Sequence, residues 1–124
     1  MTEVDRTTAY FDDVVARSGV ARGGLLEPAD GARKNDCHDN CAEFARQHPD
    51  HEIVRGWLVI GGHWLVPHSV VRHTPTGKLK DITPRTADAE GIPFVEHRGS
   101  EEDFATLRVG RDGGWLHPPV NAML

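Results

Sequence analysis

The feature that most restricts the fold is an apolar stretch in the middle of the chain, residues 51–73, with the sequence HEIVRGWLVIGGHWLVPHSVVRH. It contains two runs rich in Val, Ile, Leu and Trp, and Gly61 and Gly62 lie between them. Such runs favour buried strands, and the glycines favour a turn. The stretch therefore predicts two antiparallel strands. A second turn at residues 74–77 and a strand over residues 78–83 extend the predicted sheet to three or more strands.

Helices are predicted before this stretch in the chain. Residues 5–18 carry apolar side chains at helical spacing, and Gly19 ends the pattern. A second helix opens with Asn35 or Asp36 as its cap and stops near Pro49, because proline cannot continue a helix. We expect an α+β fold in which this central helix packs on a small antiparallel sheet.

The remaining segments have weaker patterns. Residues 19–36 contain many glycines and predict a loop, with Leu25 and Leu26 anchored in the core. A capping-box pattern at Ser100 predicts a short helix after it. The tail, residues 110–124, contains too much glycine and proline to predict regular structure.

Composition limits the classes of function. The chain has 124 residues, of which 38% are hydrophobic and 27% charged, and this composition is typical of one globular domain over residues 1–124. A formal net charge of −5 offers no basic surface to nucleic acid or an anionic membrane. No apolar run approaches the roughly 20 residues that span a bilayer, and no secretory signal is recognisable. We expect a cytoplasmic protein with reduced cysteines.

The register of the second predicted hairpin places two polar residues together. If His73 pairs with Lys78, then His68 and Asp81 become diagonal neighbours on one face, with backbones roughly 7 Å apart. A slip of one residue would send Asp81 to the other face. Pro67 lacks an N–H and requires an edge position, a bulge or the start of a strand. The sequence thus predicts an imidazole beside a carboxylate.

Cys37 lies on the first turn of the predicted central helix. Unpaired backbone N–H groups and the helix dipole favour a thiolate there. An imidazole that accepts the thiol proton, itself oriented by a carboxylate, would complete an activated nucleophile. His38 is not expected to be that base, because adjacent side chains on a helix point apart. Cys41 lies one turn further along, beside Phe44, and is predicted to be a packing residue.

The order of Cys37, His68 and Asp81, with the cysteine opening a helix and the other two on following antiparallel strands, resembles the papain-like and transglutaminase-like cysteine hydrolases. The resemblance covers residues 35–84. It implies acyl transfer through a thioester, with Cys37 as nucleophile, His68 as general base and then acid, and Asp81 as the orienting group. It further implies an amide or ester substrate, either a peptide, a protein or a small amide. Hydrolase, amidase, peptidase, deamidase and transferase activities all fit, and none needs a cofactor.

Several residues are candidates for binding the oxyanion or the substrate. A backbone N–H of Cys37 or His38 would supply one hydrogen bond to the oxyanion. The candidates for a second donor are Asn35, Trp57, His63 and Trp64. Asn40, one turn below Cys37, either contacts the site or bonds the loop before the helix. We expect a shallow substrate groove between the 19–36 loop and the C-terminal tail.

Other interpretations stay open at this point. One is a zinc site, because thiolates and imidazoles are typical ligands of tetrahedral zinc. Its ligands would be Cys37, Cys41, His63 and His68. Another is a non-catalytic binding module that uses the apolar tail around Trp115. A third is purely structural, with His68 as a hydrogen-bonded core residue and Asp81 as an exposed acid. The other histidines are expected at the surface: His48, His51, His73, His97 and His117.

Overall fold

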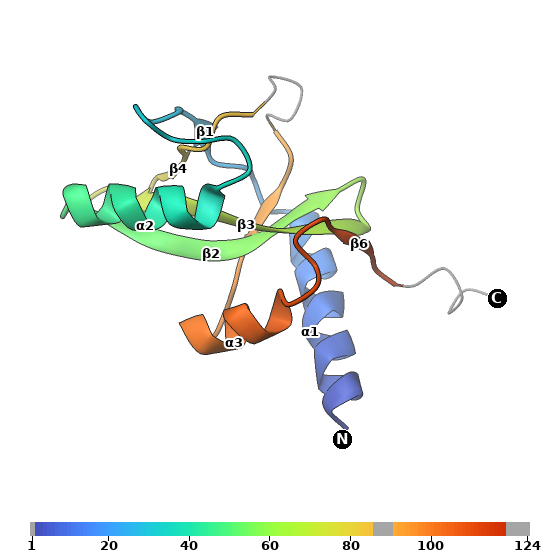
Figure 1. Cartoon of the computed structure of the whole chain (residues 1–124). Coiled ribbons are helices and arrows are strands. Elements are labelled where there is room, and N and C mark those ends of the chain that lie inside the picture. Colours follow the sequence, from blue (N-terminus) through green and yellow to red (C-terminus); the bar gives the residue numbers. More distant parts are fainter. Residues whose placement is uncertain (1, 86–90, 119–124) are drawn as a thin grey trace.

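The computed structural model describes residues 2–85 and 91–118. Within these residues the fold is mixed α+β, with three helices and a six-stranded sheet (Figure 1). The elements in chain order are α1 (Glu3–Ser18), β1 (Leu25–Leu26), α2 (Cys37–Gln47), β2 (His51–Ile60), β3 (Trp64–His73), β4 (Leu79–Asp81), β5 (Phe94–Glu96), α3 (Glu101–Leu107) and β6 (Trp115–Leu116). The predicted α+β class is confirmed.

β2 and β3 form one long antiparallel hairpin, as predicted. Their pairing runs from His51 opposite His73 at the open end to the turn at Gly61 and Gly62. The two glycines have φ angles of 63° and 82°, in the left-handed region that a residue without a Cβ adopts freely. The apolar runs and the glycine pair therefore specify this part of the fold together.

β4 pairs with β3 near the open end of the hairpin. Val71 lies opposite Lys80, and the His73 N–H donates a hydrogen bond to the Lys78 carbonyl at 2.9 Å. This is the register that the predicted turn requires, so the placement of His68 and Asp81 on neighbouring strands is confirmed.

Three short strands were not predicted. β1 runs parallel to β4, β5 pairs with β2, and β6 pairs with β3 near its start. The predictions of an irregular 19–36 loop and an irregular tail were therefore wrong at β1 and β6, because strands of two residues carry no detectable alternation. Leu25 is 64% exposed, so its predicted burial was also wrong.

The sheet order is β1-β4-β3-β2-β5. β6 pairs with β3 along the same edge of β3 as β4 does. Pro67 lies in β3 between the part that pairs with β4 and the part that pairs with β6. In the described part of the chain no strand pairs with this middle stretch on that side. Such an edge position tolerates a residue without an N–H. It also leaves an opening beside His68.

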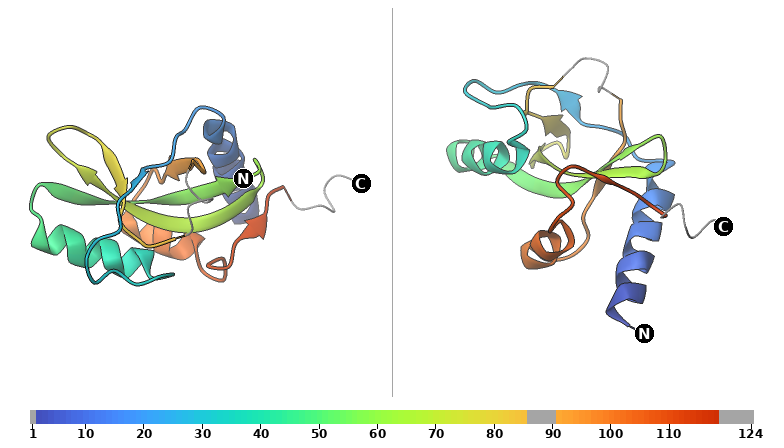
Figure 2. Two further views of the ribbon diagram at one scale, coloured as in Figure 1. Left: turned by 90° about the horizontal axis from the view of Figure 1, so that it is seen from above. Right: turned by 45° about the vertical axis from the view of Figure 1, so that its right-hand side comes forward.

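All three helices cover one face of the hairpin. Phe11 of α1 and Phe104 of α3 contact the buried Trp57, while Cys41 of α2 packs in the cluster that includes Ile53. Trp57 and Ile53 are four residues apart on β2, so both point to this face. Figure 2 shows α2 towards one end of the hairpin and α1 towards the other.

Capping interactions fix where two helices begin. Thr2 Oγ1 accepts the Asp5 N–H at 3.2 Å and Asp5 Oδ2 accepts the Thr2 N–H, so α1 begins slightly before the predicted residue 5. Ser100 Oγ accepts the Asp103 N–H at 3.0 Å, which confirms the predicted short helix. Within the described ranges, no helix combines the length and apolar character needed to cross a membrane.

Candidate active site

Cys37 is the first residue of α2. Asp36 is the N-cap residue, as one of the two predicted alternatives, but its side chain makes no capping hydrogen bond. Asn35 enters the helix with a φ of 61°, an uncommon backbone conformation for a residue with a side chain. The N–H groups of the first turn are therefore not occupied by the Asp36 carboxylate. They and the helix dipole act on the Cys37 sulfur, which is partly buried.

His68 and Asp81 form a buried pair. His68 Nε2 lies 2.7 Å from Asp81 Oδ2, and the side chains are 8% and 1% exposed. The Thr83 N–H donates to the other carboxylate oxygen at 3.3 Å. The predicted imidazole–carboxylate contact is confirmed, and the reading of Asp81 as an exposed acid is wrong. With Nε2 turned towards Asp81, Nδ1 of His68 is the nitrogen available to Cys37.

The electrostatics of Cys37 and His68 favour a thiolate beside an imidazolium. Burial alone raises the pKa of Cys37, but hydrogen bonds from His38 and His68 and the charge on the His68 ring outweigh it and lower the pKa to about 6. Burial alone lowers the pKa of His68, yet its hydrogen bonds with Asp81 and Cys37 raise it to about 9. Near neutral pH the proton therefore resides on His68 rather than on Cys37.

Cys41 has the opposite character. Its side chain is 0% exposed and packs with Val71 and Ile82 in the core. Burial, and then the nearby charges of Cys37 and Asp81, raise the pKa of Cys41 to about 12. Cys41 is thus an inert core thiol, as predicted.

The four residues of the alternative zinc site do not form a cluster. His63 lies in the exposed turn between β2 and β3, five residues before His68, or roughly 16 Å along an extended strand. Cys41 is enclosed in the core. Among the residues that the structure describes, no group of three or more His, Cys, Asp or Glu side chains is arranged to hold a metal ion.

A pocket of about 410 Å³ opens beside Cys37 and His68. Its lining residues are Asn35, Asp36, Cys37, His38, Asp39, Leu58, Val66, Pro67, His68, Thr83, Pro84, Arg85, Arg108 and Asp112. Only the last two residues of the 19–36 loop take part, and residues 27–32 line a separate pocket beside the later part of α2. The predicted groove is therefore correct at the end of that loop and at the start of the tail, and wrong for the rest of the loop.

Most of the proposed oxyanion donors lie elsewhere. Trp57 is fully buried and donates its Nε1–H to the Tyr10 hydroxyl at 2.7 Å. His63 and Trp64 do not line the pocket, so all three were wrong candidates. Asn35 does line it, together with the backbone at the start of α2.

Asn40 takes the second of its two predicted roles, a bond to the loop before the helix. Its side chain exchanges hydrogen bonds with the backbone of Arg33, at 3.1 Å and 2.8 Å, and donates to Thr83 Oγ1 at 3.1 Å. It ties the loop before α2 to the segment that follows β4. By doing so it helps to hold Cys37 close to His68 and Asp81.

Two features of the site were missed by the sequence analysis. Arg85 Nε lies 3.3 Å from Asp81 Oδ2, and its side chain is largely buried. His38 also contributes a hydrogen bond to Cys37, so the expectation that its ring points away was wrong. No sequence pattern marks Arg85. The direction of the His38 ring depends on its contact with the Ser69 hydroxyl. Ser69 is a residue of β3, and the hairpin register could have placed it on the helix-covered face.

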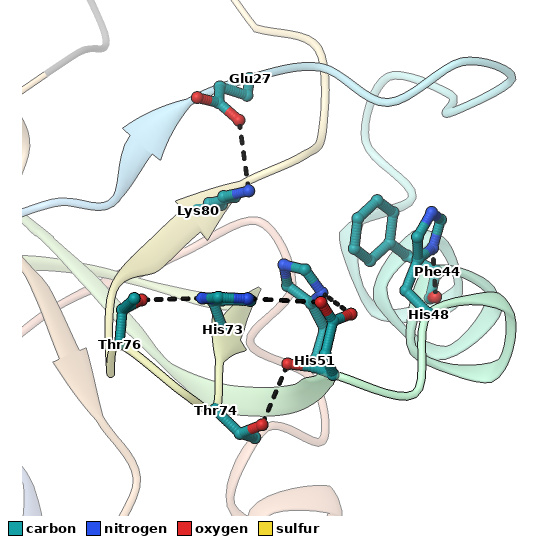
Figure 3. A network of polar contacts seen from close by, with 9 residues as sticks. Glu27, Phe44, His48, His51, His73, Thr74, Thr76 and Lys80 are labelled. Atoms are coloured by element: carbon teal, nitrogen blue, oxygen red, sulfur yellow. Dashed lines mark hydrogen bonds and ion pairs between the residues drawn. The ribbon is translucent and has the colours of Figure 1, made fainter.

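A second polar network lies at the open end of the β2–β3 hairpin (Figure 3). Asp50 contacts His51 at 2.8 Å and His73 at 3.3 Å, and the His51 side chain is only 7% exposed. The predictions that His51 and His117 lie at the surface were wrong, since His117 is buried against Asp12. None of these groups lines the pocket at Cys37.

Comparisons with protein-family models, with curated proteins and with solved structures found no match to this chain. The assignment of a function therefore depends on the geometry of the site.

Proposed function

We propose that this protein is a thiol-dependent acyl-transfer enzyme with Cys37 as the nucleophile, His68 as the general base and acid, and Asp81 as the residue that orients His68. The observation that carries the proposal is the buried contact of His68 with Asp81 at 2.7 Å, next to a cysteine whose pKa is lowered to about 6. Perturbed groups of this kind concentrate at functional sites.

The first half of the reaction forms a thioester. The Cys37 thiolate attacks the carbonyl carbon of an amide or ester, and the carbonyl electrons move to oxygen. The N–H groups of the first turn of α2 stabilise that oxyanion. When the tetrahedral intermediate collapses, the C–N or C–O bond breaks, and the imidazolium of His68 gives its proton to the departing amine or alcohol.

The second half releases the acyl group. Neutral His68 takes a proton from water while the water oxygen attacks the thioester carbon. The carboxylic acid leaves, and Cys37 returns as a thiolate beside protonated His68. If an amine or hydroxyl of another molecule replaces water, the same steps transfer the acyl group. Asp81 holds the tautomer of His68 through both halves.

The proposal includes a papain-like or transglutaminase-like core, in which a helix that begins with the nucleophile packs on an antiparallel sheet. α2 packed on β2 and β3 supports this view. The pocket combines charged groups with the apolar side chains of Leu58 and Val66, and we propose a peptide, a protein or a small amide as the substrate. No proposed step requires a metal or a cofactor.

Trapping the thioester tests the proposal directly. The protein is mixed with p-nitrophenyl acetate, quenched in acid, digested and examined by mass spectrometry. We expect acetyl on Cys37, and we expect its rate of formation to fall in His68→Ala. Cys41→Ala is the matched thiol control and should still be acetylated. Acetylation of lysines alone, or equal acetylation of Cys37 in wild type and His68→Ala, would exclude the mechanism.

A further inference from the structure

His38 makes a buried contact that its position next to Cys37 does not require. Its Nδ1 lies 2.6 Å from the Ser69 hydroxyl, and Ser69 is fully buried on β3. Arg55 on β2 donates from Nη1 to the same hydroxyl at 2.9 Å and to the His38 carbonyl at 3.2 Å. His38 is therefore attached to the sheet by both its ring and its backbone.

The Ser69 hydroxyl determines which nitrogen of His38 carries the proton. Arginine has only donors, so the bond from Arg55 uses a lone pair of Ser69 Oγ. The Ser69 hydroxyl proton then needs an acceptor, and Nδ1 of His38 lies within hydrogen-bond distance. Nδ1 can accept that bond only when it carries no proton, so the ring proton lies on Nε2. A proton added to Nδ1 would leave the Ser69 hydroxyl proton without this acceptor, beside the charge of Arg55.

We propose that Ser69 and Arg55 hold His38 as a neutral Nε2–H tautomer, and that this N–H is a fixed hydrogen-bond donor to the Cys37 sulfur. The proposal rests on the proposed function and deepens it by assigning different roles to two histidines. His68 carries the proton that moves during the reaction, because it has the carboxylate of Asp81 behind it. His38 keeps its proton and stabilises the thiolate. Ser69 and Arg55 are positioning residues in this scheme.

The surroundings of the network support a rigid arrangement. Arg55 also binds Glu101 at the start of α3, with Nε–O distances of 2.9 Å and 3.3 Å. The His38 ring contacts Phe104 of the same helix at a centroid distance of 5.7 Å. Among the charged or titratable groups around the ring, Cys37 and Arg55 interact with His38, and Glu101 binds Arg55. Together these contacts from α2, α3 and the sheet limit rotation of the ring.

The tautomer can be measured without any substrate. In wild-type protein labelled with ¹⁵N, a long-range ¹H–¹⁵N correlation spectrum distinguishes a protonated ring nitrogen from a bare one, and His38→Gln assigns the His38 signals. We expect Nε2 to be protonated and Nδ1 to be bare near neutral pH. A His38 ring protonated on Nδ1, either alone or on both nitrogens, would overturn the inference.

The effect on Cys37 is tested by iodoacetamide alkylation near pH 6, close to the lowered pKa. His38→Leu removes the donor and should slow alkylation at least roughly tenfold, because hydrogen bonds to charged groups are strong. In His38→Gln the amide keeps an N–H donor, and its rate should stay within about threefold of wild type. His63→Leu, at an exposed position outside the pocket, is the matched control and should react like wild type.

The outcomes separate this inference from the proposed function. If wild-type Cys37 reacts quickly and His38→Leu reacts equally quickly, the role of His38 is wrong and the proposed function stands. If wild-type Cys37 reacts as slowly as a free thiol with a pKa of about 8.5, both are wrong.

Discussion

His68 Nε2 and Asp81 Oδ2 lie 2.7 Å apart in a contact that joins β3 to the end of β4. Both side chains are buried, and Asp81 also lies 3.3 Å from Arg85 Nε and accepts the Thr83 N–H. A buried carboxylate with these partners holds the imidazole in one orientation. The remaining ring nitrogen then faces the start of α2, where Cys37 lies.

Asp81→Asn should reduce thioester formation by a factor on the order of 10² or more, because an amide can present a donor to Nε2 and so favour the wrong tautomer of His68. The rate of acetylation by p-nitrophenyl acetate measures this. Asp13→Asn, an exposed acid on α1, is the control and should match wild type. A normal rate in Asp81→Asn would show that the carboxylate does not orient His68.

Gly56→Ala should destabilise the fold by about 2–3 kcal/mol, because the new Cβ overpacks the sheet. That Cβ would lie 2.3 Å from the Val95 carbonyl oxygen and 2.6 Å from Phe94 Cζ. Denaturant unfolding followed by fluorescence gives the free energy. At Gly113 a Cβ meets no atom within 4 Å, so Gly113→Ala should change stability by less than about 0.5 kcal/mol. Equal stability of the two variants would mean that β5 does not pack on Gly56 as described.

The combined contribution of Cys37 and His68 to the stability of the wild type should depend only weakly on pH between about 6 and 9. The raised pKa of His68 contributes stability that is complete below its ordinary value of 6.5 and is lost as pH rises through about 9. The lowered pKa of Cys37 contributes stability that is complete above 9.0 and is lost as pH falls through about 6. The two trends oppose each other in the interval between.

Cys37→Ser removes the second trend and weakens the first, because Cys37 is one of the causes of the raised pKa of His68. Asp81 still raises the pKa of His68 in this variant, so its stability should fall on going from pH 6.5 to 9, by on the order of 1 kcal/mol more than wild type. Urea unfolding of both proteins at several pH values measures the difference. Parallel curves for the two proteins would contradict the coupling of Cys37 to His68.

The parts of the fold that were predictable are those in which local and long-range signals agree. The apolar runs on each side of Gly61 and Gly62 determine the hairpin, and the length of the next turn determines the register that brings Asp81 to His68. β1 and β6 were not predictable, because two-residue strands have no period of their own. They form only where a neighbouring strand offers free backbone groups.

The site was predictable in its order of residues and less so in its surroundings. The first turn of a helix explains the reactivity expected of Cys37. The rule that adjacent helical side chains diverge failed for His38, because the buried Ser69 hydroxyl and Arg55 draw its ring onto the sheet. Arg85 follows β4 in an irregular segment, where no periodicity indicates which way a side chain points.

The central claim is that Cys37 is a thiolate paired with His68, and the pH dependence of Cys37 alkylation tests it most directly. The rate of reaction with iodoacetamide, measured at Cys37 by peptide mass spectrometry, should rise with an apparent pKa of about 6 in the wild type. In His68→Ala the midpoint should move towards the free-thiol value of about 8.5. A wild-type midpoint near that free-thiol value, unchanged in His68→Ala, would contradict the account.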